Sequence, residues 1–72
     1  MKRDGWIKDL NGLWILRFRY DWKSWDQNPK VLIEKGRLYS NGPPLLKDRR
    51  SMRRGLAIKL WRELLSTGWR RV

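Results

Sequence analysis

In residues 13–20, large apolar or aromatic side chains at the even positions alternate with a second set, Leu13, Ile15, Arg17 and Arg19, and this pattern constrains the fold more than any other. Successive side chains of a β-strand point to opposite faces, so such alternation predicts a half-buried strand. Every second side chain is large and apolar or aromatic: Trp14, Leu16, Phe18 and Tyr20. We expect this aromatic face to belong to the core. The other face ends in Arg17 and Arg19 and is expected to be exposed there.

Turn-forming residues on either side of this strand predict its neighbours. Asn11-Gly12 precedes it, and this dipeptide favours a type I′ hairpin turn, in which both central residues have positive φ. Residues 6–10 are therefore expected to pair with it as a short extended segment. Residues 30–34, with Val-Leu-Ile at their centre, predict a third strand. Residues 21–29 between the two strands are expected to form a loop or short turn.

A second Asn-Gly turn introduces an alternative with one more strand. Residues 40–44 contain Asn41-Gly42 followed by two prolines, which is turn chemistry. This turn could close a hairpin between Leu38-Tyr39 and Leu45-Leu46. Gly36 is expected either to end the third strand or to interrupt it with a bulge.

The last third of the chain predicts an amphipathic helix. At 100° per residue its apolar side chains fall on one broad arc: Leu56, Ala57, Ile58, Leu60, Trp61, Leu64 and Leu65. Ser51 is the predicted N-cap. Gly68 suits the position just after the helix, where Trp69 would add a hydrophobic contact.

These elements give an α+β fold of order β-β-β-α. A small antiparallel sheet of three strands, or four if Leu45-Leu46 pairs, packs against one C-terminal helix. A chain of 72 residues forms one domain, residues 1–72. Trp14 and Trp61 are expected in the core, because so small a domain needs its largest apolar side chains there.

Composition excludes several kinds of chemistry. The chain has no Cys and no His, which excludes disulfides, thiolate or imidazole metal sites and His-based catalytic relays. Asp21 and Asp26 are interpreted as solvated loop carboxylates rather than a nuclease centre. We therefore expect no enzyme activity, no cofactor, no metal and no small-molecule substrate. With no bilayer-spanning run and no signal peptide, we expect a cytoplasmic protein.

The balance of charge points to an anionic partner. Lys and Arg number 18 against 7 Asp and Glu, which gives a net charge of +11. Arg and Lys bind phosphates and release counterions from nucleic acid. We therefore predict a nucleic-acid-binding protein, DNA or RNA, whose main phosphate contacts come from the basic block at residues 47–54. The candidate contact residues are Arg17, Arg19, Lys47, Arg49, Arg50, Arg53, Arg54, Arg70 and Arg71.

Two features leave alternatives open. Trp22 and Trp25 could stack on bases or anchor a partner, but a small core favours their folding back on the sheet. The basic, Trp-bearing surface could instead dock on an acidic protein, which would make the chain an interaction module or small regulator. Association with an anionic membrane surface is the least favoured reading, because the sheet needs the helix's apolar arc.

The combined motifs resemble the domain-of-unknown-function family 1651, small proteins of marine picocyanobacteria. The resemblance rests on Trp25 with Asn28-Pro29-Lys30-Val31, Asn41-Gly42, Pro44-Leu45-Leu46-Lys47 with Arg49-Arg50, Ala57 with Leu60-Trp61, and Leu64 with Gly68-Trp69. It implies a cyanobacterial, cytoplasmic setting and carries no activity. Members of the family often have acidic residues before the helical Ala, where this chain has Gly55 and Leu56.

Overall fold

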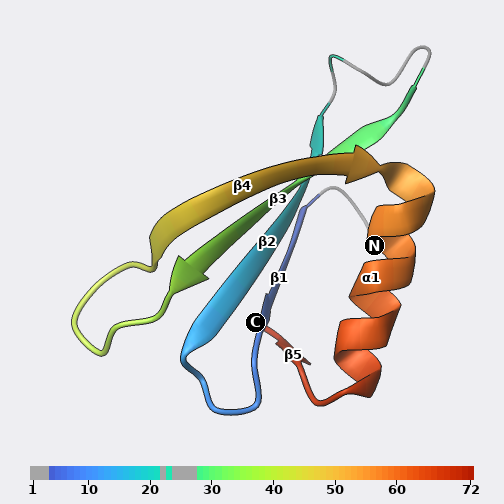
Figure 1. Ribbon diagram of the computed structural model, residues 1–72. Helices are drawn as coiled ribbons and strands as arrows, with labels where there is room; N and C mark the ends of the chain where they lie inside the picture. The colour runs from blue at the N-terminus through green and yellow to red at the C-terminus, as the bar shows by residue number, and fades with distance from the viewer. Residues whose placement is uncertain (1–3, 22, 24–27) are drawn as a thin grey trace.

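The computed structural model describes residues 4–21, 23 and 28–72. These residues form one antiparallel sheet of five strands, in the spatial order β4-β3-β2-β1-β5, and one helix that lies across the sheet (Figure 1). The elements are β1 (Asp4–Lys8), β2 (Trp14–Asp21), β3 (Lys30–Arg37), β4 (Leu45–Arg53), α1 (Arg54–Ser66) and β5 (Arg70–Arg71). The predicted α+β class is confirmed, but the prediction of three or four strands was too low.

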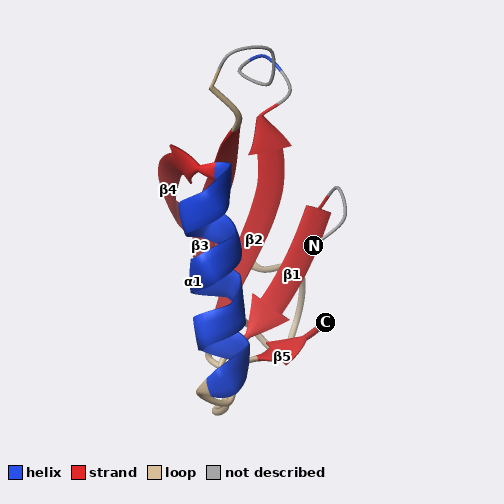
Figure 2. Ribbon diagram, turned by 90° about the vertical axis from the view of Figure 1, so that its right-hand side faces the viewer, coloured by secondary structure: helices blue, strands red, loops and turns tan. Residues whose placement is uncertain are grey.

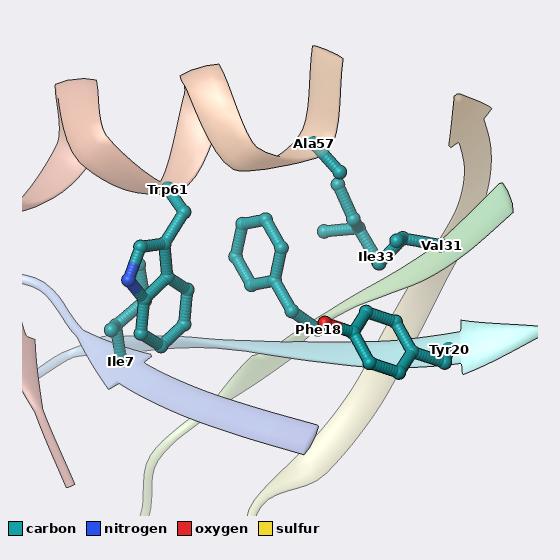
Figure 3. Close-up of a cluster of buried hydrophobic side chains, with 7 residues drawn as sticks. All are labelled: Ile7, Phe18, Tyr20, Val31, Ile33, Ala57 and Trp61. Atoms are coloured by element: carbon teal, nitrogen blue, oxygen red, sulfur yellow. The ribbon is translucent and has the colours of Figure 1, made fainter. Parts of the chain in front are cut away.

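The core forms where α1 crosses the middle of the sheet (Figures 2 and 3). Trp61 meets Phe18 edge to face, with ring centroids 5.0 Å apart and planes at 86°, an arrangement that aromatic pairs favour. Ala57 is fully buried one turn earlier, and its small side chain lets the helix approach the strands closely. Ile7 and Val31 are also fully buried in this cluster. The expected packing of β2 against the helix is therefore confirmed at Phe18.

Trp14 does not join this cluster, which corrects its expected core position. Its side chain is only partly buried, and the Lys35 ammonium and the Arg37 guanidinium lie 4.6 and 5.3 Å from the ring centroid. These two residues lie on β3, next to Trp14, which pairs with Arg37. Trp14 is the first residue of β2, directly after the turn that joins it to β1. Its ring contacts cations there and does not pack in the core.

The first hairpin turn differs from the predicted type I′. Gly12 has φ +72°, but Asn11 does not have a positive φ, whereas a type I′ turn needs one at both central residues. Asp9 organises the turn instead. Its Oδ1 accepts hydrogen bonds from the backbone N–H groups of Leu13 and Trp14, with N···O distances of 2.8 and 3.1 Å. A turn of this kind places the positive φ at one glycine and leaves Asn11 unstrained.

The basic block is a strand rather than the approach to a helix. β4 runs through it as an edge strand, paired only with β3. Its side chains are exposed at every position except Met52. Charged residues are tolerated there because neither face of an edge strand need be fully covered. Ser51 therefore lies within β4 and is not the N-cap, which is Arg53 without a side-chain hydrogen bond.

A glycine marks the irregular point of the β3–β4 hairpin. The register between β3 and β4 shifts at Lys35/Gly36, so Lys47 is the extra residue on β4. A Cβ on Gly36 would lie 2.7 Å from the carbonyl oxygen of Leu45. Gly36 therefore does not end β3, and the irregularity expected there falls opposite it, with the extra residue on β4. The turn at residues 40–44 does close a hairpin, but Leu45 and Leu46 pair with Arg37 and Gly36 rather than with Leu38-Tyr39.

The end of the helix forms as predicted. Gly68 has φ +111°, and the Trp69 N–H donates to the Leu64 carbonyl at 3.1 Å, which is the long-range bond of a Schellman motif. Trp69 packs against the core cluster. This reversal directs the chain back to β1, where β5 adds two residues to the sheet edge.

Gly5 and Gly55 offer a matched test of the helix–sheet contact. A Cβ on Gly5 would lie 2.6 Å from Cη2 of Trp61, whereas a Cβ on Gly55 would meet nothing within 4 Å. We expect Gly5→Ala to lower the free energy of unfolding by about 1–3 kcal/mol through overpacking. Gly55→Ala should leave it unchanged or raise it by up to about 1 kcal/mol. Thermal unfolding of both variants checks this, and a Gly5→Ala protein as stable as the wild type would contradict the packing described.

Candidate nucleic-acid interface

The helix covers only one face of the sheet (Figures 1 and 2). Alternation along the strands and the pairing register assign residues to the other face. We call this the open face and define it by five residues from β1, β2, β3 and β4: Trp6, Arg17, Arg19, Glu34 and Arg49. Arg17 pairs with Glu34 across β2 and β3, and Glu34 pairs with Arg49 across β3 and β4.

Glu34 is the centre of the open face. It is 5 % exposed and is the one buried charged residue among the described residues. Its Oε2 accepts a hydrogen bond from Nη2 of Arg49 at 3.3 Å. Its Oε1 lies 3.5 Å from Nη2 of Arg19 and 3.9 Å from Nη1 of Arg17. A buried carboxylate is costly unless cations compensate it, and here three guanidinium groups do so.

This arrangement leaves a surplus of positive charge at the surface. One carboxylate neutralises one of the three guanidinium groups that surround it. The Arg49 side chain is 63 % exposed and that of Arg19 is 35 % exposed. Each guanidinium has five N–H donors, and Glu34 uses only some of them. The exposed donors can therefore bind a second anion while Glu34 fixes the guanidinium positions.

Trp6 holds the Arg17 guanidinium from the side opposite Glu34. The guanidinium carbon lies 5.0 Å from the Trp6 ring centroid, within the range of a cation–π contact. Trp6 comes from β1 and is directly paired with Arg17 on β2. The planar guanidinium is thus positioned by an aromatic ring and a carboxylate at once, and its side chain is 26 % exposed.

The structure divides the arginines of the predicted basic block. Arg49 and Arg50 are neighbours on β4, so alternation places them on opposite faces. Arg50 lines a groove of about 280 Å³ between β4 and α1, together with Met52 and Leu60. Arg49 lies four residues before Arg53, about 13 Å along an extended strand. The expected gathering of four arginines at the start of the helix is therefore not observed.

The remaining predicted contact residues fall in several places. Lys8 and Lys30 lie on the open face, because they are an even number of residues from Trp6 and Glu34 on the same strands. Arg70 and Arg53 pair with them and therefore lie on this face too. Arg71 faces the helix, with its guanidinium 5.9 Å from the Trp61 ring centroid. Lys47 is exposed at the bulge of β4, and Arg54 is the first residue of α1.

Sequence reasoning missed the two residues that organise the open face. The sequence placed Glu34 at the end of the strand predicted at residues 30–34 and Trp6 at the start of the extended segment at residues 6–10, and neither was a candidate contact residue. The sequence did contain a signal for Glu34, because alternation along the strand places Val31 and Ile33 on one face and Glu34 on the other. A carboxylate on the polar face of a central strand, beside a strand with Arg17 and Arg19 on its polar face, predicts a cross-strand ion pair. Trp22 and Trp25 lie outside the described residues.

The chain was compared with known protein families, curated proteins and solved structures. The family described as "Protein of unknown function (DUF1651)" matches residues 4–72. The chain belongs to this family. DUF1651 therefore covers all five strands and the helix, including every residue of the open face. Neither the curated proteins nor the solved structures gave a match. In the part of this DUF1651 chain that is described, no helix has the length and apolar character needed to cross a membrane.

Glu34→Gln tests whether the buried carboxylate holds the open face together. The substitution removes the one negative charge that three guanidinium groups surround, and we expect it to lower the free energy of unfolding by about 1–3 kcal/mol. This is below the 3–5 kcal/mol typical of a broken buried pair, because the arginines are partly exposed. Glu63→Gln makes the same change of charge at an exposed position of α1, and should alter stability by less than about 0.5 kcal/mol. Equal unfolding midpoints for the two variants would contradict this role of Glu34.

Proposed function

We propose that this DUF1651 protein is a non-enzymatic nucleic-acid-binding protein that contacts the phosphate backbone with the open face. The observation that carries the proposal is the set of guanidinium groups around Glu34, which are fixed in position and still partly exposed. Arginine presents several donors in a plane that matches phosphate oxygens. A face that holds such groups in place loses little side-chain entropy when a phosphate binds.

The distribution of charge supports the same partner. By register, Lys8, Lys30, Arg53 and Arg70 extend the cations of the open face to its ends, and Asp21 lies opposite Lys30 on the same face. The net charge of +11 exceeds the magnitude of about 2–8 that suits solubility in a small domain. Repulsion within so basic a chain favours binding to a polyanion. A long anion such as a nucleic-acid strand could reach cations along the whole face at once.

The residues argue against catalysis at this site. Glu34, the buried carboxylate of the described residues, is surrounded by the guanidinium groups of three arginines and orients them. The chain has no His or Cys to serve as a base or nucleophile near neutral pH. A cytoplasmic, cyanobacterial setting is part of the proposal and rests on the family resemblance alone.

Two matched double variants test the proposal. Arg49→Gln/Arg53→Gln removes two cations from the open face, and Lys59→Gln/Arg62→Gln removes two exposed cations from α1. We expect the wild type to bind a fluorescently labelled single strand in the micromolar range at low salt. In plots of log affinity against log salt, the slope should fall by about 1.4 for the open-face variant, since each lost phosphate contact is worth about 0.7. The helix variant should keep a slope near that of the wild type.

The comparison separates a binding face from a general effect of charge. Equal losses in the two double variants would mean that only net charge matters, and would contradict the assignment to the open face. A wild-type protein that binds neither single-stranded nor duplex nucleic acid at low salt would overturn the proposed function. An acidic protein would then become the candidate partner. Thermal unfolding of each variant must first establish that it is folded.

A further inference from the structure

The open face is too broad to enter a groove of duplex DNA. Four neighbouring strands, β1 to β4, contribute to it, and their outer axes are about 14 Å apart at 4.7–4.9 Å per strand. The major groove is about 12 Å wide and admits a helix or a two-stranded ribbon. An undeformed duplex could therefore offer this face only the outside of its phosphate backbone. A single strand could lie on the face and present its bases as well.

Trp6 and Arg17 offer flat surfaces that an unpaired base could use. Both side chains are partly exposed, and the guanidinium lies against the indole ring, 5.0 Å from its centroid. Bases stack on aromatic rings and on guanidinium planes without regard to sequence. Glu34 contacts the same guanidinium at 3.9 Å. The pair is thus held by three adjacent strands before any ligand arrives.

Cations flank this pair along the strands. Lys8 follows Trp6 by two residues on β1, and Arg19 follows Arg17 by two residues on β2. Because β1 and β2 are antiparallel, these two cations lie on opposite sides of the pair, each about 7 Å away along the strand direction. A base stacked at the centre would therefore have a cation near the phosphate on either side of it.

We infer that the Trp6–Arg17 pair is a stacking platform for an unpaired base, so that the open face binds single-stranded nucleic acid in preference to duplex. This inference rests on the proposed function, since it names the form of nucleic acid that the same face takes. Stacking would add to the affinity that the phosphates supply, and that added part would not depend on salt.

Three labelled probes of one length separate stacking from charge. They are a mixed-sequence single-stranded 12-mer, its duplex, and an abasic 12-mer that has the phosphates without the bases. We expect the wild type to bind the single strand about 5- to 150-fold more tightly than the abasic strand, the range for one stacked base. Its affinity for the single strand should also exceed that for the duplex at the same salt concentration.

Two tryptophan variants provide the matched comparison. Trp6→Leu should abolish the preference for the single strand over the abasic strand while leaving the salt slope unchanged. Trp14→Leu is the control, because Trp14 also contacts cations but lies on the face of β2 that the helix covers. This variant should keep the preference. Arg17→Lys keeps the charge and loses the planar group, so it should reduce the preference even if Trp6→Leu does not fold.

The outcomes distinguish this inference from the proposed function. If the wild type binds single-stranded and abasic probes equally, or prefers the duplex, the stacking platform is overturned and phosphate binding stands. If Trp14→Leu loses the preference and Trp6→Leu keeps it, the platform has been assigned to the wrong face. If none of the probes binds at low salt, both the platform and the proposed function fail.

Discussion

A single helix of 13 residues can cover only one face of this sheet. It is about 20 Å long, and its buried residues Ala57 and Trp61 are committed to the side where Phe18 lies. The opposite face must therefore be stabilised without a second layer. On this face the chain has a buried carboxylate, the arginines around it and Trp6, together with Ile15, which is buried and lies on the same face by register. This division of the two faces places the cations where a partner can reach them.

The same constraint explains why the open face suits binding. A face covered by a helix would have lost its access to anions, and a face of mobile lysines would lose more side-chain entropy on binding. Glu34 instead draws Arg17, Arg19 and Arg49 to one point through pairing on both sides of β3. Three guanidinium contacts offset part of its desolvation cost, and these contacts hold the guanidinium groups in position at the surface.

Much of the fold was predictable because the patterns that determine it are local. The alternation at residues 13–20 identified β2, the apolar arc identified α1, and Gly68 with Trp69 identified the end of the helix. Only the first two residues of β4, Leu45 and Leu46, were predicted as a possible strand, because Arg49, Arg50 and Arg53 have no strand signal of their own. An edge strand with exposed side chains is selected by its partner, here β3 through Val31 and Ile33, rather than by its own hydrophobic pattern.

The candidate site was less predictable, because it depends on register. The sequence identified the cations, but their grouping follows from which residues face one another across strands that are distant in the chain. Arg50 and Arg71 were expected beside Arg49 and Arg70, and alternation places them on the helix side instead. Glu34 and Trp6 acquire their roles only from cross-strand neighbours, which a single sequence does not specify.

The most direct test of this account is a map of where nucleic acid touches the protein. In ¹⁵N–¹H NMR spectra at low salt, titration with a single-stranded 12-mer should shift the guanidinium Nε–Hε signals of Arg17, Arg19 and Arg49. The signals of Arg62 on the outer surface of α1 should stay in place. Shifts confined to Arg54 and Arg62, with the open-face arginines unchanged, would contradict the central claim that the face organised by Glu34 is the binding surface.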